Sequence, residues 1–587
     1  MRSFLKIFLA SLAALILFSI AVFFAISIII GNATSPSKPD IGSKGVLVLD
    51  LSQMFAEQAK NNPLNELFDN PSSDVPGLYD VVRMIHYAKK DSSIKGIYIK
   101  AGDNENGYAA SEELRQALID FKKSNKFIIA YGSVIPERAY YVATVADKVY
   151  CNPAGGVEWD GFSVDEMFLK GLLDKLEIKP EIFYAGKFKS ATEPLRVTEM
   201  TDANRLQTTV WLNDIYNNLL IRTADARHTD TASLHQLANS GAIQTANDAL
   251  KYNLVDGLKY DDEVRTEILK RLKKDQKQEI NFVPFGKYAK AVDFEKDGDG
   301  GKVDIIYADG DIVDGKGDKD QIGSDDFVKL IRKARLDDDV KAIVFRVNSP
   351  GGSSMASEAI WREISLAKKA KPVVVSMGDY AASGGYYISC AADSVFADET
   401  TITGSIGVFS VLANLKDFFN DKLGITFDGV KTGPYADLGS ISRPLTDQER
   451  NFIQSSVDTI YNLFKTRVAN GRKKDIVYID SIAQGRVWIG KRAIGVGLVD
   501  RTGTLQDAVD CAARMAKLSD YRTREYPEQK SWLEELTESG TLSAQSQQKA
   551  LIKEIGQQQY DLLKKSKQVS EMINIPQARL PFDINVR

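Results

Sequence analysis

Residues 342–352 read Ala-Ile-Val-Phe-Arg-Val-Asn-Ser-Pro-Gly-Gly, a β-rich run that ends in a proline-glycine-glycine turn. Farther along, Val373-Val374-Val375 is followed by Ala381-Ala382-Ser383-Gly384-Gly385-Tyr386-Tyr387. Continuous β-branched runs separated by amphipathic helical stretches indicate mostly parallel strands that are buried on both faces. This part of the chain is therefore expected to form an α/β domain.

The first half of the chain carries a similar pattern. Three matched pairs share an offset of 246 (358 minus 112, 386 minus 140, 392 minus 146): Glu112 with Glu358, Tyr140 with Tyr386, and Ala146 with Ala392. Several blocks at one offset indicate an internal duplication, so both halves are expected to be α/β. At that offset Gly352 falls opposite Asn106 and Ser383 opposite Glu137. Only the second copy therefore has the glycine turn and the serine.

The chain has 587 residues, which is too long for a single hydrophobic core. The turn-forming run Asp297-Gly298-Asp299-Gly300-Gly301 predicts a boundary between the copies. The expected organisation is an N-terminal anchor (1–31), a linker (32–43), a first repeat (44–296), a second repeat (297–520) and a polar helical tail (521–587).

Composition excludes several classes of function. A net charge of -4 offers no basic footprint, so nucleic acid is not expected as a partner. The 3 cysteines are widely spaced and form no Cys-x-x-Cys pair, so neither a disulfide framework nor a zinc site is predicted. No metal, nucleotide or other cofactor is expected.

The amino terminus predicts a membrane anchor. Arg2 and Lys6 precede an uncharged run from Ile7 to Ile30, which as a helix would be about 36 Å long and could cross a hydrocarbon core of about 30 Å. A cleavable signal peptide is the alternative, since Gly31-Asn32-Ala33 offers small residues, but the run exceeds the usual length of such a peptide. The positive charges favour a cytoplasmic amino terminus, which in a bacterium puts the remaining chain on the periplasmic side of the inner membrane.

Two glycine-rich turns in the second repeat can support acyl transfer. In the turn Pro350-Gly351-Gly352, the backbone N–H groups of the two glycines can point into the space at the end of a strand, as an oxyanion hole requires. Ser383 lies at a similar place after the next strand, between small neighbours that leave its hydroxyl unobstructed. Each motif has a plainer explanation, because such glycines often serve packing and such a serine often caps a helix.

A nucleophilic serine needs a base, and histidine is a poor candidate here. His86, His228 and His235 are the only histidines, and none belongs to a glycine-rich or constrained turn. A buried lysine can replace histidine because desolvation lowers its pKa. Lys189 has no lysine counterpart in the second repeat, just as Ser383 has no serine counterpart in the first. This reciprocal absence is expected if the base of one repeat serves the nucleophile of the other. The plainer alternative is a solvated surface lysine.

The motifs together resemble the long form of the signal peptide peptidase A family, also called protease IV or peptidase family S49, a family of membrane-anchored serine peptidases. The motifs are Lys-Ser-Ala-Thr-Glu-Pro at 189–194, Asn-Ser-Pro-Gly-Gly at 348–352, Ala-Ala-Ser-Gly-Gly-Tyr at 381–386 and Thr-Gly-Ser-Ile-Gly at 403–407. The resemblance covers nearly the whole chain and implies two tandem ClpP/crotonase-like domains.

The resemblance also implies roles for five residues. It makes Ser383 the nucleophile and Lys189 the general base, assigns the oxyanion hole to the backbone N–H groups of Gly352 and Gly384, and gives Ser405 the task of orienting the lysine amine. It further implies a homotetramer that degrades remnant signal peptides and other unfolded chains, which favours cleavage next to small or apolar side chains.

Two other functions stay open at this stage. A crotonase-like enzyme acting on acyl-CoA would use the same type of glycine turn to hold a thioester oxygen, and fold alone does not decide function. A catalytically inactive membrane scaffold is the other alternative. The anchor and the reciprocal serine and lysine favour the peptidase.

Overall fold

The computed structural model describes residues 14–18, 20, 38–59, 75–295, 300–318, 320–528, 556 and 575–580. Most of the predicted anchor and most of the predicted helical tail lie outside these residues. Among the residues that are described, no helix is long and apolar enough to cross a membrane.

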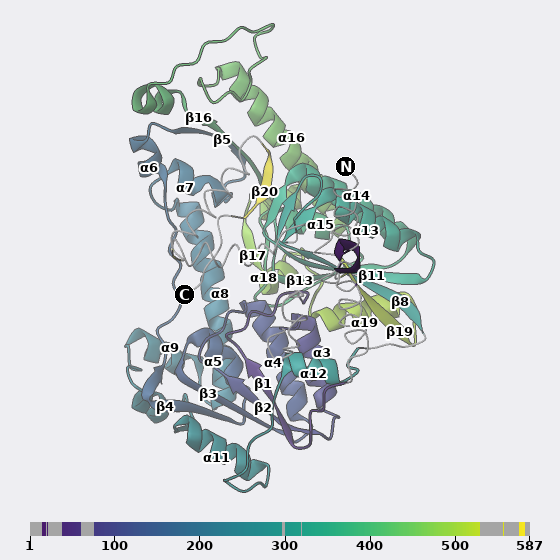
Figure 1. Ribbon diagram of the computed structural model, residues 1–587. Helices are drawn as coiled ribbons and strands as arrows, with labels where there is room; N and C mark the ends of the chain where they lie inside the picture. The colour runs from purple at the N-terminus through teal and green to yellow at the C-terminus, as the bar shows by residue number, and fades with distance from the viewer. Residues whose placement is uncertain are drawn as a thin grey trace, which may run out of the picture.

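The first repeat is built on a six-stranded parallel sheet in the order β6-β4-β3-β2-β1-β7 (Figure 1). Its strands are β1 (Gly45–Asp50), β2 (Ile94–Lys100), β3 (Phe127–Ile135), β4 (Lys148–Val157), β6 (Gly257–Leu258) and β7 (Phe282–Pro284). Helices cover both faces: α3 (Leu78–Ala88) and α4 (Tyr108–Lys122) lie on one, and α11 (Asp261–Arg271) lies on the other. Alternate strand residues such as Ile97 and Tyr98 therefore enter different cores. The prediction of parallel strands buried on both faces is confirmed.

The second repeat forms a sheet in the order β17-β15-β13-β11-β8-β19, with β14 and β18 beside β13. Its strands are β8 (Gly301–Asp309), β11 (Val340–Ser349), β13 (Val373–Ala382), β14 (Ser394–Ala397), β15 (Ile402–Gly404), β17 (Val487–Ile489), β18 (Arg501–Thr502) and β19 (Tyr521–Tyr526). Among the strand pairs that the described residues form in this sheet, β15–β17 alone is antiparallel. Helices α13 (Ser324–Leu336), α14 (Ser354–Ala370) and α15 (Gly384–Ser389) follow β10 (Gln321–Gly323), β12 (Gly351–Ser353) and β13, respectively.

The duplication extends to the long helices. α8 (Asp202–Arg227) and α16 (Asp447–Arg472) each have 26 residues, begin after a threonine N-cap and end before a residue in the left-handed conformation. In addition, the hydroxyls of Tyr140 and Tyr386 each donate to the carbonyl oxygen of a leucine far along the chain. The two halves therefore repeat interior contacts as well as strand order.

A third sheet, which the sequence did not predict, joins the two repeats in the order β10-β9-β12-β20-β16-β5. Its strands are β5 (Lys179–Ala185), β9 (Asp311–Val313), β10 (Gln321–Gly323), β12 (Gly351–Ser353), β16 (Val408–Asn414) and β20 (Gln577–Arg579). β5 comes from the first repeat and runs antiparallel to β16 of the second, from the pair Ala185/Val408 to the pair Lys179/Asn414. This pairing brings the chain that leaves β5 beside the chain that enters β16.

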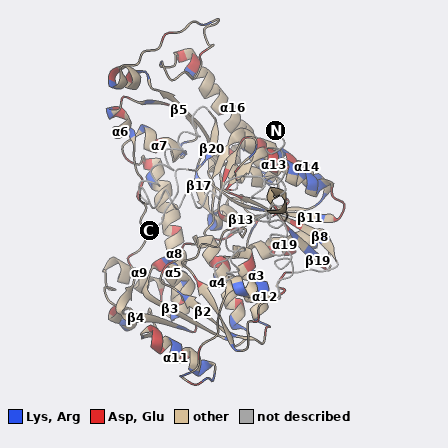
Figure 2. Cartoon of the chain, in the orientation of Figure 1, with Lys and Arg blue, Asp and Glu red and all other residues tan. Residues whose placement is uncertain are grey.

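A buried charge cluster also lies between the repeats. Arg346 on β11 is 1% exposed and forms ion pairs with Glu57 (2.7 Å) and Glu113 on α4 (2.8 Å). Asp379 on β13 accepts a hydrogen bond from the backbone N–H of Ala109, in the first turn of α4. Because a buried charge that loses its partner is strongly destabilising, the cluster restricts how the two repeats can meet. Elsewhere, Lys and Arg as well as Asp and Glu are distributed over both repeats (Figure 2).

Candidate active site

Ser383 lies between the end of β13 and the start of α15, in a strained backbone conformation. Its φ of 55° and ψ of -112° are unfavourable for a residue with a side chain, and such strain persists only where the surroundings enforce it. Here its backbone N–H donates to the carbonyl of Gly404 at 2.8 Å, and its carbonyl accepts from the N–H of Tyr387 at 2.8 Å. The side chain makes no capping bond to α15, which argues against the helix-cap explanation.

Lys189 reaches Ser383 from the first repeat. The chain leaves β5 at Ala185, turns at Gly186 and is held by a 2.7 Å bond from the N–H of Phe188 to the carbonyl of Gln484. Lys189 is 1% exposed, which excludes the surface-lysine alternative. Its Nζ lies 2.8 Å from Ser383 Oγ, so the structure makes the contact that the reciprocal absence predicted.

The lysine amine has two further partners, both on Ser405. Nζ lies 3.1 Å from Ser405 Oγ and 3.3 Å from its carbonyl oxygen. Burial lowers the pKa of Lys189 well below the usual 10.5, and burial is the only cause of the shift. A neutral amine has two N–H groups and one lone pair. If Ser405 accepts both N–H groups, the lone pair faces Ser383 Oγ.

The glycine turn after β11 lies beside Ser383. Gly351 has φ of 105°, and a β-carbon at this position would lie 2.7 Å from the backbone nitrogen of Gly384 and 2.1 Å from the carbonyl oxygen of Ala578. Gly352 pairs with Ala578 in the antiparallel β12–β20 ladder. The two residues predicted to supply oxyanion donors, Gly352 and Gly384, therefore both lie next to the same backbone carbonyl.

Gln207 on α8 supports this arrangement, and the sequence analysis missed it. Its amide nitrogen donates to the carbonyl of Phe188 at 3.0 Å, and its amide oxygen accepts from the N–H of Val487 at 3.2 Å. It thereby fixes the residue before Lys189 against the second repeat. The histidines serve other contacts: His86 pairs with Asp120, and the ring of His235 packs near Tyr216.

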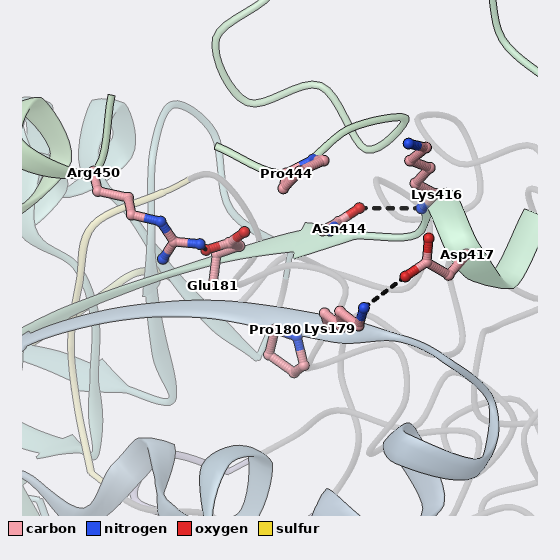
Figure 3. A pocket seen from close by; sticks show the side chains of 8 residues that line it. All are labelled: Lys179, Pro180, Glu181, Asn414, Lys416, Asp417, Pro444 and Arg450. Carbon is pink, nitrogen blue, oxygen red and sulfur yellow. Dashed lines mark hydrogen bonds and ion pairs between the residues drawn. The ribbon is translucent and has the colours of Figure 1, made fainter. Parts of the chain in front are cut away.

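The opposite end of the β5–β16 pair holds a separate surface pocket (Figure 3). Its charged side chains face one another in ion pairs between Lys179 and Asp417 (2.6 Å) and between Glu181 and Arg450 (2.5 Å). These pairs link the repeats at the end of β5 away from Lys189, so the pocket contributes no group to the serine and lysine pair.

Ser405→Ala is expected to lower kcat about 3- to 10-fold with little change in KM, because one hydrogen bond that orients the amine is lost. Loss of an acceptor for the ammonium form should also shift the acid limb of the pH profile of kcat to lower pH. Steady-state kinetics on a peptide substrate between pH 6 and pH 10 would measure both. Ser410→Ala, at a buried serine on β16, is the matched control and should leave the profile in place. An unchanged profile for Ser405→Ala would contradict the orienting role.

Comparison with known proteins finds family models and relatives that match both repeats of the chain. A family model described as Peptidase family S49 matches residues 120–277 and 365–519, one segment in each repeat, and one described as Clp protease matches residues 306–401. Protease 4 of Salmonella typhi is 35% identical over 536 residues, which cover 88% of this chain and 85% of that protein. Protease 4 of Haemophilus influenzae is 32% identical over 526 residues, with coverages of 86% and 85%. The chloroplastic serine protease SPPA of Arabidopsis thaliana is 33% identical over 438 residues, 73% of this chain and 64% of that protein.

Proposed function

We propose that this chain, which belongs to peptidase family S49 and is a serine peptidase, cleaves polypeptides with a Ser/Lys dyad shared between its two repeats. The observation that carries the proposal is the 2.8 Å separation of Lys189 Nζ and Ser383 Oγ in a fully buried setting. Each repeat supplies one half of the pair.

The low pKa of Lys189 gives the dyad its chemistry. A neutral amine can take the proton from Ser383 Oγ as that oxygen attacks the scissile carbonyl carbon. The resulting ammonium then protonates the leaving amine, and water hydrolyses the acyl-enzyme with the lysine again as base. Ser405 holds the amine so that its lone pair faces the serine.

The backbone N–H groups of Gly352 and Gly384 are the proposed oxyanion donors. Both lie next to the backbone carbonyl oxygen of Ala578, a residue of β20 that pairs with β12. Fixed N–H groups in a buried site would stabilise the charge that develops on the oxygen of the scissile carbonyl without any reorganisation.

The location is proposed from the sequence, and the substrates and the assembly are proposed from the resemblance to the family. The uncharged run at residues 7–30 would anchor the enzyme in the bacterial inner membrane, with both repeats on the periplasmic side. Signal peptides released into that membrane, and other unfolded chains, are the proposed substrates, and a homotetramer is the proposed assembly. Small or apolar side chains next to the cut fit substrates of this composition.

The test compares wild type with Ser383→Ala on three substrates: a synthetic signal peptide, unfolded casein and an acyl-CoA thioester. Wild type should cleave both polypeptides and leave the thioester intact, and the variant should cleave none. Ser389→Ala, at a buried serine in α15, controls for changes in packing. A serine-directed covalent probe should modify wild type at Ser383, as read by peptide mass mapping. Thioester hydrolysis without peptide cleavage would favour the acyl-CoA enzyme, and no turnover of any substrate would favour the scaffold.

A further inference from the structure

A glutamine near the start of α8 holds the lysine turn on both sides of the base. Gln207 is 2% exposed, and its Nε2 donates to the carbonyl of Phe188 at 3.0 Å and to Ser190 Oγ at 3.1 Å. These are the residues immediately before and after Lys189. A single buried amide therefore fixes the backbone from which the lysine side chain extends.

The other end of the same amide reaches the ladder that holds the serines. Gln207 Oε1 accepts the backbone N–H of Val487 at 3.2 Å. Val487 pairs with Gly404 in the β15–β17 ladder, and the carbonyl of Gly404 accepts the backbone N–H of Ser383. Ser405, the other partner of the lysine amine, follows Gly404 directly. One side chain thus connects the backbone of the base to the backbone of the nucleophile.

Asn204, one turn earlier on α8, decides which end of the Gln207 amide faces the lysine turn. Asn204 is 1% exposed, and its Nδ2 donates to Glu166 at 3.0 Å. Its Oδ1 therefore faces Gln207, where it accepts from Nε2 at 3.2 Å. An acceptor can be paired only with the N–H end of the Gln207 amide, so Oε1 is left for Val487.

This amide pair occurs only in the repeat that supplies the lysine. Aligning the N-caps of α8 and α16, which are 245 residues apart (446 minus 201), places Asn204 opposite Glu449 and Gln207 opposite Phe452. Glu449 closes a capping box at the start of its own helix, and Phe452 is 43% exposed. The corresponding positions of the second repeat therefore serve the helix end and the surface.

The cap of α8 also ties the lysine turn to this helix. The backbone N–H and the hydroxyl of Thr201 donate to Glu193 at 3.1 and 2.6 Å. Glu193 begins α7 (Glu193–Arg196), four residues after Lys189, and α8 continues from there toward the helices of the first repeat (Figure 1). Because Glu193 satisfies the cap from outside the helix, Asn204 is free to bond to Gln207. The segment from 188 to 193 is thus attached to α8 at both ends.

We propose that Gln207, oriented by Asn204, is a positioning residue for the base: it holds the turn at 188–190 against β17, so that Lys189 Nζ stays aligned with Ser383 Oγ and shielded from water. The inference rests on the proposed Ser/Lys dyad. The described bonds of Gln207 go to Phe188, Ser190, Asn204 and Val487, so it acts through the backbone around the lysine rather than on a reacting atom.

Loss of this support should change the base in a direction opposite to loss of Ser405. Burial alone keeps the pKa of Lys189 low. The carboxyl groups of the network, Glu166 and Glu193, bond to polar groups at the start of α8 rather than to the amine. If the turn loosens and water reaches the amine, the ammonium form is better solvated and the pKa of Lys189 rises toward 10.5. The acid limb of the pH profile of kcat should then move to higher pH.

The test measures steady-state kinetics of Gln207→Met and wild type on a peptide substrate between pH 6 and pH 10. Methionine has a similar length but makes none of the four bonds. We expect kcat to fall about 10- to 100-fold with little change in KM, the cost of a small displacement of a reacting group. The acid limb should move to higher pH. Asn204→Ala, which leaves the Gln207 amide in place without its orienting partner, should move the limb in the same direction with a loss of about 3- to 10-fold.

Gln454→Met is the matched control. Gln454 lies on the other 26-residue helix, α16, and also bonds across the repeats, because its Nε2 donates to the carbonyl of Tyr184 on β5 at 3.4 Å. Its bond is not part of the lysine turn. The variant should keep kcat within a factor of about 3 and leave the pH profile in place.

Melting temperatures measured for every variant separate positioning from a general loss of structure. A folded Gln207→Met enzyme with a wild-type kcat, or with a lower kcat and an unmoved acid limb, would overturn the positioning role and leave the dyad standing. If Gln207→Met does not fold, Asn204→Ala decides by the same two readouts. A wild type that cleaves no polypeptide would instead overturn the proposed function, and this inference with it.

Discussion

Lys189→Met is expected to lower kcat for peptide cleavage by about 10²- to 10⁴-fold, the usual contribution of a general base. Methionine has a similar length and fills the buried space without an amine, so the expected loss reflects proton transfer rather than collapse of the site. Because Ser383 Oγ would have no other base among its described contacts, activity should stay low at every pH tested. Stopped and continuous assays with a fluorogenic peptide between pH 6 and pH 10 would measure this.

Lys187→Met provides the matched control, since this lysine lies two residues earlier on the same turn but is exposed. It should retain kcat within a factor of about 3, as expected for a surface change. A Lys189→Met enzyme with wild-type kcat would exclude this lysine as the base and would leave Ser383 with an activation mechanism that the contacts of the site do not supply.

The same substitution should raise stability at neutral pH. The pKa of Lys189 in the folded chain is well below the 10.5 of the free side chain, so between these two values the unfolded chain binds a proton that the folded chain does not. Stability therefore rises with pH across that window, and at pH 7 the lysine disfavours folding. Removing the amine removes this penalty. Calorimetry should give a higher melting temperature for Lys189→Met than for wild type at pH 7, with the difference shrinking as pH approaches 10.5. A lower melting temperature across the range would contradict a neutral, buried lysine.

Strand prediction succeeded where burial on both faces leaves a clear pattern. Runs such as Val373-Val374-Val375 have no polar alternation, because helices cover both sides of a parallel sheet, and they lie within β13 as expected. The contact between Lys189 and Ser383 was also predictable, because comparing the two duplicated copies shows that each has one of these residues and lacks the other. Their catalytic roles remain predictions that the kinetic variants test.

The third sheet could not be predicted for a physical reason. β20 contains only Gln577–Arg579, and its stability depends on pairing with the glycine turn rather than on any β-rich run of its own. The role of Gln207 was not predicted for a similar reason. A glutamine on a 26-residue helix carries no local sequence signal of the backbone groups to which it will bond. The buried Arg346 cluster likewise depends on how the repeats dock.

Gly351→Ala is expected to lower kcat by about 10²- to 10³-fold, the range seen when an oxyanion hole loses a donor. An added β-carbon would lie 2.1 Å from the carbonyl oxygen of Ala578 and 2.7 Å from the backbone nitrogen of Gly384. Both neighbours are backbone atoms and cannot rotate away, so either an oxygen at the position of the Ala578 carbonyl or the Gly384 N–H must move. KM and kcat measured on the fluorogenic peptide should show the loss mainly in kcat, since the charge on the oxygen develops in the transition state.

Backbone strain alone must be separated from this steric effect, because Gly351 has φ of 105° and any side chain there is unfavourable. Gly424→Ala makes the separation: it also lies in the left-handed region, with φ of 66°, but a β-carbon there meets nothing within 4 Å. Gly424→Ala should therefore show a slightly lower melting temperature and a normal kcat. Gly351→Ala should show a lower melting temperature and a lower kcat. Equal kcat values for the two variants would mean that the carbonyl beside Gly351 does not mark the oxyanion position. In that case the substrate would have to bind in a different register from the β12–β20 ladder.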